Sequence, residues 1–137
     1  MYNTIKINYI TMNMEENMDL KISEMIEMSK KLHDKNSWNF NTEYGQKSFL
    51  LLIGEIGETI EILMKIGSES VMKEEEIRSK FIEELADTLT YFANILNCYD
   101  ISAEEFAKIY RSKFSKNMKR DFTSRRSNFK NKTVSEE

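Results

Sequence analysis

The sequence contains no proline, and only four of its 137 residues are glycine. β-Sandwiches and barrels use both residue types in their many turns. The scarcity of both therefore argues against a turn-rich β protein and favours long helices. A chain of this length also suits a single domain that can bury its own core.

Cysteine and histidine are equally scarce, since Cys98 and His33 are the single representatives of each type. One cysteine excludes an internal disulfide and a cysteine-built zinc site within this chain. One histidine leaves little scope for a His-rich metal centre or a Ser-His-Asp triad. We expect His33 at the surface near a helix end, and Cys98 as a small buried residue at a helix end.

Long apolar runs are also missing, because none reaches the roughly 18 residues that a membrane-spanning helix needs. Residues 1–17 lack the apolar segment of a secretory signal. We therefore expect a cytoplasmic protein that makes no membrane contact.

Charge is distributed unevenly around a net value of −3. Ten lysines and arginines lie between Lys108 and Lys132, against one acid, Asp121. A cationic end of this kind suits a phosphate ligand or nucleic acid. Nucleic acid is the less favoured partner because the helices before this end are acidic. The composition beyond Phe122 is also typical of a solvated, disordered tail.

Hydrophobic periodicity predicts four helices with short connections, over about residues 19–34, 42–67, 74–97 and 102–118. Asp19 is the expected N-cap of the first helix. The core-facing side of the third helix is expected to consist of Phe81, Leu85, Leu89, Phe92 and Leu96.

The predicted fold class is all-α, with a four-helix bundle-like domain over residues 18–122. Residues 1–17 form an N-terminal arm in this scheme, and residues 123–137 form a polar basic tail.

The second predicted helix carries two acids within an apolar stripe. Leu51, Glu55, Glu58 and Ile62 are spaced by four, three and four residues, so they share one face. Glu61 belongs to the solvent side. A buried carboxylate without a partner is strongly unfavourable, so Glu55 and Glu58 need a cation or must stay protonated.

The third predicted helix repeats this arrangement with Glu84 and Asp87, and Tyr91 continues the same polar stripe. If the two helices pack side by side, Glu55, Glu58, Glu84 and Asp87 converge. Oxygen ligands without histidine or thiolate suit Mg²⁺ or Mn²⁺, and magnesium typically arrives bound to substrate phosphates. The alternative is that both pairs lie on solvated faces, since Glu-x-x-Glu is common on helices.

These residues resemble a family. The segments Gly54-Glu-Ile-Gly-Glu58 and Glu84-Leu-Ala-Asp87 look like the ExxE…ExxD signature of the MazG-like all-α nucleoside triphosphate pyrophosphohydrolases. Residues 113–120, Lys-Phe-Ser-Lys-Asn-Met-Lys-Arg, resemble that family's Lys…Asn…Arg segment. The likeness covers about residues 20–122 and is nearest to the dCTP-pyrophosphatase-like branch, although Leu63-Met64-Lys65 stands where that branch commonly has an aromatic residue.

The resemblance implies an oligomeric enzyme, a homodimer or homotetramer, that hydrolyses a nucleoside triphosphate between its α- and β-phosphates. Glu55 or Glu58 would activate the water, and the sequence does not choose between them. By resemblance the metal ligands are Glu55, Glu58, Glu84 and Asp87, and the substrate-binding residues are Trp38, Tyr91, Lys113, Asn117 and Arg120.

Two other classes of protein stay open. A non-enzymatic helical interaction protein would carry the same acids on solvated faces, and would show neither turnover nor stabilisation by metal. A nucleic-acid-binding module would use the basic end, and its binding would depend strongly on salt.

Overall fold

The computed structural model describes residues 19–120, and every regular element within them is an α-helix. The all-α prediction is confirmed for this part of the chain. The predicted arm over residues 1–17 and the predicted tail over residues 123–137 lie outside the described residues. No helix between residues 19 and 120 is long and apolar enough to cross a membrane.

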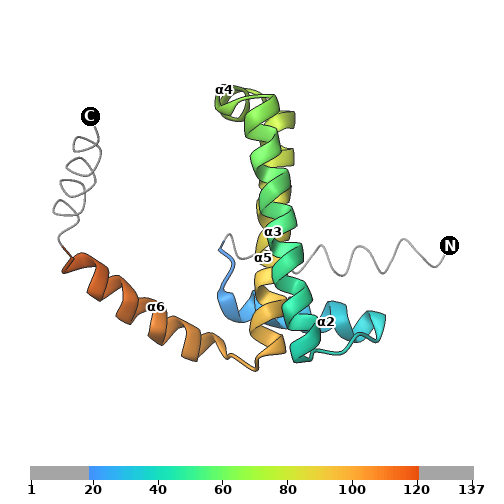
Figure 1. Cartoon of the computed structure of the whole chain (residues 1–137), viewed down its shortest axis with the longest axis vertical. Coiled ribbons are helices and arrows are strands. Elements are labelled where there is room, and N and C mark those ends of the chain that lie inside the picture. Colours follow the sequence, from blue (N-terminus) through green and yellow to red (C-terminus); the bar gives the residue numbers. More distant parts are fainter. Residues whose placement is uncertain (1–18, 121–137) are drawn as a thin grey trace, which may run out of the picture. The chain divides into compact units, whose positions relative to one another are not determined.

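Within residues 19–120, five helices follow one another (Figure 1). They are α2 (Ile22–Asn36), α3 (Thr42–Lys65), α4 (Ser68–Lys73), α5 (Glu75–Cys98) and α6 (Ala103–Met118). The chain divides into two compact units after Ala103, so α6 belongs almost wholly to the second unit and is described by itself.

The first unit is organised around two long helices, α3 and α5, which run side by side (Figure 1). Helix α2 packs across α5 at one end of this pair, and the short helix α4 packs against α5 at the other end. The buried apolar residues follow this arrangement. Ile26 of α2 lies at the last turns of α5, where the Asn97 amide donates to its carbonyl, and Ile62 and Val71 are buried near the end of α3 and on α4.

The ends of the helices differ from the predicted ones for local reasons. Asp19 does not cap α2. Instead, Lys21 precedes the helix, and its backbone N–H donates to the Glu24 carboxylate at 2.7 Å. At the start of α3, the Asn41 side chain accepts from the backbone N–H of Tyr44 at 2.7 Å. The predicted connection after Gly67 contains α4, so it is not a simple loop.

The predicted core stripe of α5 is only partly correct. Leu96 is buried, but Leu85 and Leu89 remain 43% and 48% exposed. The reason is the small number of helices in the first unit. Among the described helices, only α2, α3 and α4 make extensive contacts with α5, and α2 packs against the C-terminal half of α5.

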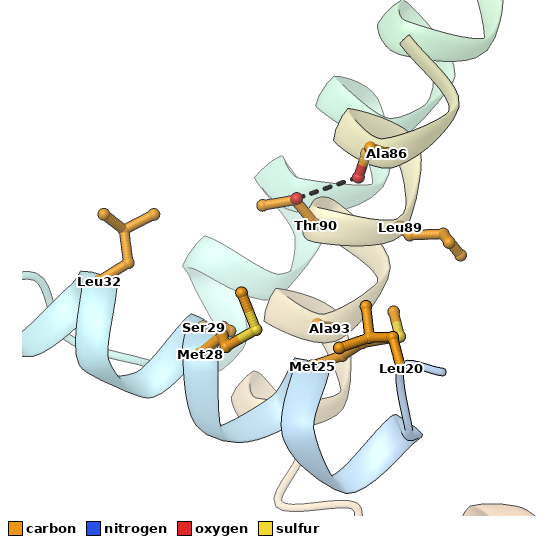
Figure 2. Close-up of a pocket in the computed structure, with 9 residues that line it drawn as sticks. All are labelled: Leu20, Met25, Met28, Ser29, Leu32, Ala86, Leu89, Thr90 and Ala93. Atoms are coloured by element: carbon orange, nitrogen blue, oxygen red, sulfur yellow. Dashed lines mark hydrogen bonds between the residues drawn. The ribbon is translucent and has the colours of Figure 1, made fainter. Parts of the chain in front are cut away.

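An apolar groove of about 410 Å³ lies between α2 and α5 (Figure 2). Met25, Met28 and Leu32 line it from α2, and Leu89 and Ala93 line it from α5. The one hydrogen bond drawn there is local to α5, where the Thr90 hydroxyl donates to the Ala86 carbonyl at 3.0 Å. The walls of the groove are therefore almost wholly apolar.

Candidate functional site

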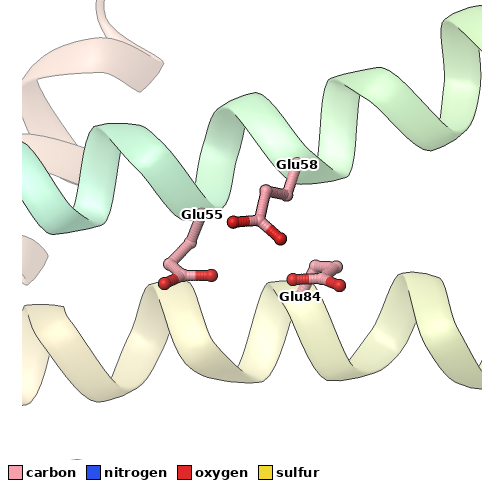
Figure 3. A group of neighbouring side chains, drawn as sticks. All are labelled: Glu55, Glu58 and Glu84. Atoms are coloured by element: carbon pink, nitrogen blue, oxygen red, sulfur yellow. The ribbon is translucent and has the colours of Figure 1, made fainter.

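Three carboxylates meet between α3 and α5 (Figure 3). Glu55 and Glu58 project from successive turns of α3, and Glu84 projects toward them from α5. One oxygen of each side chain lies within 4.8 Å of the corresponding oxygen of the other two. We call Glu55, Glu58 and Glu84 the acidic group. Such spacing lets a single ion contact all three carboxylates.

The electrostatics of the acidic group are those of uncompensated negative charge. Burial raises the pKa of Glu55, and the neighbouring charges of Glu58, Asp87 and Glu84 raise it further. Within residues 19–120, no lysine or arginine forms a salt bridge to the acidic group. By contrast, Glu61 on the same helix forms a salt bridge with Lys65, and this pair lowers the pKa of Glu61.

Asp87, the fourth predicted ligand, lies outside this group of three. Its side chain is exposed, yet its charge acts on both Glu55 and Tyr91. The structure therefore brings together three of the four predicted carboxylates and places the fourth beside them.

Tyr91, on α5, interacts electrostatically both with the acidic group and with Tyr44 at the start of α3. Its pKa is raised first by burial, then by the charge of Glu55, and then by Tyr44 and Asp87. Tyr91 therefore lies close to both Glu55 and Tyr44, and its phenol keeps its proton at neutral pH.

A hollow of about 690 Å³ opens at the start of α3, where Trp38, Tyr44 and Leu51 line it together with polar side chains. Leu51 precedes Glu55 by one helical turn, so the hollow and the acidic group lie on the same side of α3. Trp38 is 52% exposed and leaves an aromatic face available to a ligand.

The expectation that His33 lies at the surface is wrong, since its side chain is only 1% exposed. The Phe40 ring stacks on the imidazole at a centroid distance of 3.8 Å. Trp38 and Tyr44 contact it edge-on, at 5.3 and 5.1 Å. We call these four residues the His33 aromatic cluster. The signal in the sequence was the density of aromatic residues just after His33. Cys98, in contrast, is buried at the last position of α5, as predicted.

Three of the predicted substrate-binding residues lie near the C-terminal end of the described residues. Lys113 and Asn117 are on α6, and Arg120 follows its last turn, where the Arg120 backbone N–H donates to the Asn117 carbonyl at 3.1 Å. All three belong to the second unit, so their approach to the acidic group stays a prediction.

Comparison of this chain with known protein families, curated proteins and solved structures finds no match. The site must therefore be interpreted from its own geometry and from the motifs in the sequence.

Proposed function

We propose that this protein is a divalent-metal-dependent nucleoside triphosphate pyrophosphohydrolase, which releases a nucleoside monophosphate and pyrophosphate. One observation carries the proposal. Three carboxylates from two helices bring their oxygens within 4.8 Å of one another, and no basic side chain of the described residues compensates them. Charges held this close without a partner favour a cation from outside.

The donor set fits a hard cation, because it consists of carboxylate oxygens alone. Glu55, Glu58 and Glu84 would hold Mg²⁺ or Mn²⁺, with Asp87 beside them. The metal would lower the pKa of a bound water and neutralise phosphate charge.

The protein's own residues supply positioning and proton transfer. A Glu55 or Glu58 carboxylate not fully engaged by metal accepts a proton from the attacking water. Trp38 stacks on the base, and Tyr91, which is subject to the charge of Glu55, contributes to binding of the nucleoside. Lys113, Asn117 and Arg120 neutralise the β- and γ-phosphates, a role that rests on the motif they resemble.

The proposed enzyme is a homodimer or homotetramer. Support comes from α3, where Phe49, Ile53, Ile60 and Met64 are large apolar side chains that remain exposed in the single chain. Exposed apolar surface on this scale marks an interaction face. Analytical ultracentrifugation at micromolar concentration tests this point, and a monomeric species contradicts it.

A turnover screen tests the reaction. The wild-type protein and Glu84→Ala are incubated with Mg²⁺ and each of the eight standard ribo- and deoxyribonucleoside triphosphates, and pyrophosphate and orthophosphate are measured separately. The proposal predicts pyrophosphate release that the variant lacks. Orthophosphate alone contradicts cleavage between the α- and β-phosphates. Release of neither product, without thermal stabilisation by Mg²⁺, favours a non-enzymatic interaction protein that uses the exposed apolar side chains.

A further inference from the structure

His33 sits in the last turn of α2, enclosed by rings that come from two other parts of the chain. Trp38 and Phe40 belong to the loop of residues 37–41, and Tyr44 belongs to the first turn of α3. The imidazole is therefore the surface on which this loop packs its two aromatic side chains.

Neither ring nitrogen of His33 makes a hydrogen bond of good geometry to the described residues, although the Asn94 carboxamide lies close enough to favour the protonated ring. A protonated imidazole has two N–H donors and a full charge, and both are costly to bury without partners. Burial accordingly lowers the pKa of His33, while the Asn94 carboxamide and the Asp34 charge oppose this shift. The neutral ring is the form that fits its surroundings.

The groups that face His33 offer little to stabilise a positive charge. On α2, the Asp34 carboxylate is exposed to solvent, which screens it. The loop of residues 37–41 has no charged side chain. Helix α3 presents the Tyr44 phenol, and α5 presents the neutral Asn94 carboxamide. Cys98, also on α5, packs against the start of α3, and burial raises the pKa of its thiol.

Other contacts hold α2 on α5 without His33. The Ser29 hydroxyl donates to the Asn94 side chain at 2.7 Å, and the Asn97 amide donates to the Ile26 carbonyl at 3.1 Å. Within the loop after α2, the backbone N–H of Trp38 donates to the His33 carbonyl at 3.0 Å, a bond that does not involve the imidazole. Loss of the ring contacts would therefore free the Trp38 and Phe40 side chains and leave the helices in place.

We propose that His33 is a positioning residue that acts as a pH-sensitive latch: its neutral ring holds Trp38 and Phe40 in place, and its protonation releases them. Trp38 and its neighbours Asn39 and Asn41 line the hollow at the start of α3. Acidification therefore removes one wall of that hollow. We also expect the protein to bind a nucleotide less tightly at low pH, and only this consequence rests on the proposed function.

The composition of the chain makes the latch directly measurable, because Trp38 is the only tryptophan and His33 the only histidine. The full-length protein, without ligand, is titrated from pH 8 to pH 4.5 while Trp38 fluorescence and its quenching by acrylamide are recorded. We expect one fluorescence transition with a midpoint below 6.5, the ordinary pKa of histidine. The quenching constant should rise by up to about twofold, since Trp38 is already half-exposed.

Two variants and one further measurement decide the origin of the transition. His33→Phe keeps an aromatic ring but cannot take up a proton, so its fluorescence should not depend on pH in this range. Asp34→Asn changes an exposed residue and should lower the midpoint. Far-ultraviolet circular dichroism of the same samples should stay constant through the transition.

A transition that persists in His33→Phe, or one that coincides with loss of helicity, overturns the proposal. So does a wild-type signal that stays constant from pH 8 to pH 4.5. Because no nucleotide is present, a failed latch cannot be confused with a failed enzymatic assignment.

Discussion

Helix α5 takes part in two polar regions that are built in opposite ways. Where α2 crosses α5, the polar groups are neutral and bind one another, as in the 2.7 Å hydrogen bond from Ser29 to Asn94. Farther along α5, where it packs against α3, the carboxylates of Glu55, Glu58 and Glu84 have no basic partner among the described residues. In the first region the polar groups satisfy one another's hydrogen bonds and thereby stabilise the fold. In our proposal, the second region is completed by a cation from outside.

The largest effect should come from removing a carboxylate of the acidic group. Glu58→Gln should lower pyrophosphate release at least as much as the roughly 10–100-fold that loss of an outer-shell metal partner costs. Glu61→Gln is the matched control, because Glu61 lies on the same helix but pairs with Lys65. Initial rates with saturating Mg²⁺ measure both variants. Equal losses in the two would contradict a special role for the acidic group.

Substitutions in the neutral region between α2 and α5 should lower the stability of the protein. Asn94→Ala removes the acceptor of the Ser29 hydroxyl inside the fold, and should lower the free energy of unfolding by about 2 kcal/mol. Thr90→Ala on the same helix serves as the control, since its exposed hydroxyl bonds only within α5. Urea unfolding monitored by circular dichroism compares them. A smaller loss of unfolding free energy for Asn94→Ala than for Thr90→Ala would contradict the structural role of the neutral region.

Two glycines of α3 differ strongly in how closely other residues pack against them. A Cβ at Gly45 would lie 2.7 Å from a Tyr99 ring carbon and 3.1 Å from the Cys98 Cβ, whereas a Cβ at Gly57 would meet nothing within 4 Å. Gly45→Ala should therefore destabilise the protein by about 1–3 kcal/mol. Gly57→Ala should stabilise it by about 0.5–1 kcal/mol through helix propensity. Thermal unfolding measures both, and destabilisation by Gly57→Ala would show that another copy covers this face.

The smallest expected effect is on stability, and it tests whether the Glu55 carboxylate destabilises the fold or supports it. Because the pKa of Glu55 is raised in the folded state, metal-free protein should lose stability as pH rises above the unfolded value of 4.5. Glu55→Gln should relieve part of this loss, by roughly 0.2–0.5 kcal/mol for a like-charge pair one turn apart. Unfolding in the presence of a chelator at pH 7 measures it. Destabilisation by this variant would mean that the Glu55 carboxylate supports the fold.

Helical periodicity predicted the part of the site that depends on regular geometry. The spacing of Glu55 and Glu58 placed both on one face of a helix, and the spacing in α5 placed Glu84 on a similar face. Packing of the two helices then brings these three side chains together, as Figure 3 shows. Residues on regular helices inherit their neighbours from the period of the helix.

Periodicity could not predict features that depend on irregular backbone or on the number of packed helices. The burial of His33 arises because the loop after α2 folds back and places Phe40 on the imidazole. Leu85 fits the pattern of a core residue but stays 43% exposed, because the first unit has few helices to cover α5. The short helix α4 spans only six residues, too few for a helical period to show, and packs against α5.

The central claim is that the acidic group binds a divalent cation, and Mn²⁺ binding followed by electron paramagnetic resonance tests it most directly. Free Mn²⁺ gives a sharp signal that decreases on binding. The account predicts that wild-type protein and Glu83→Gln, a change at the exposed residue next to Glu84, remove this signal, and that Glu84→Gln does not. Equal binding by all three proteins, or binding by none of them, would contradict the account.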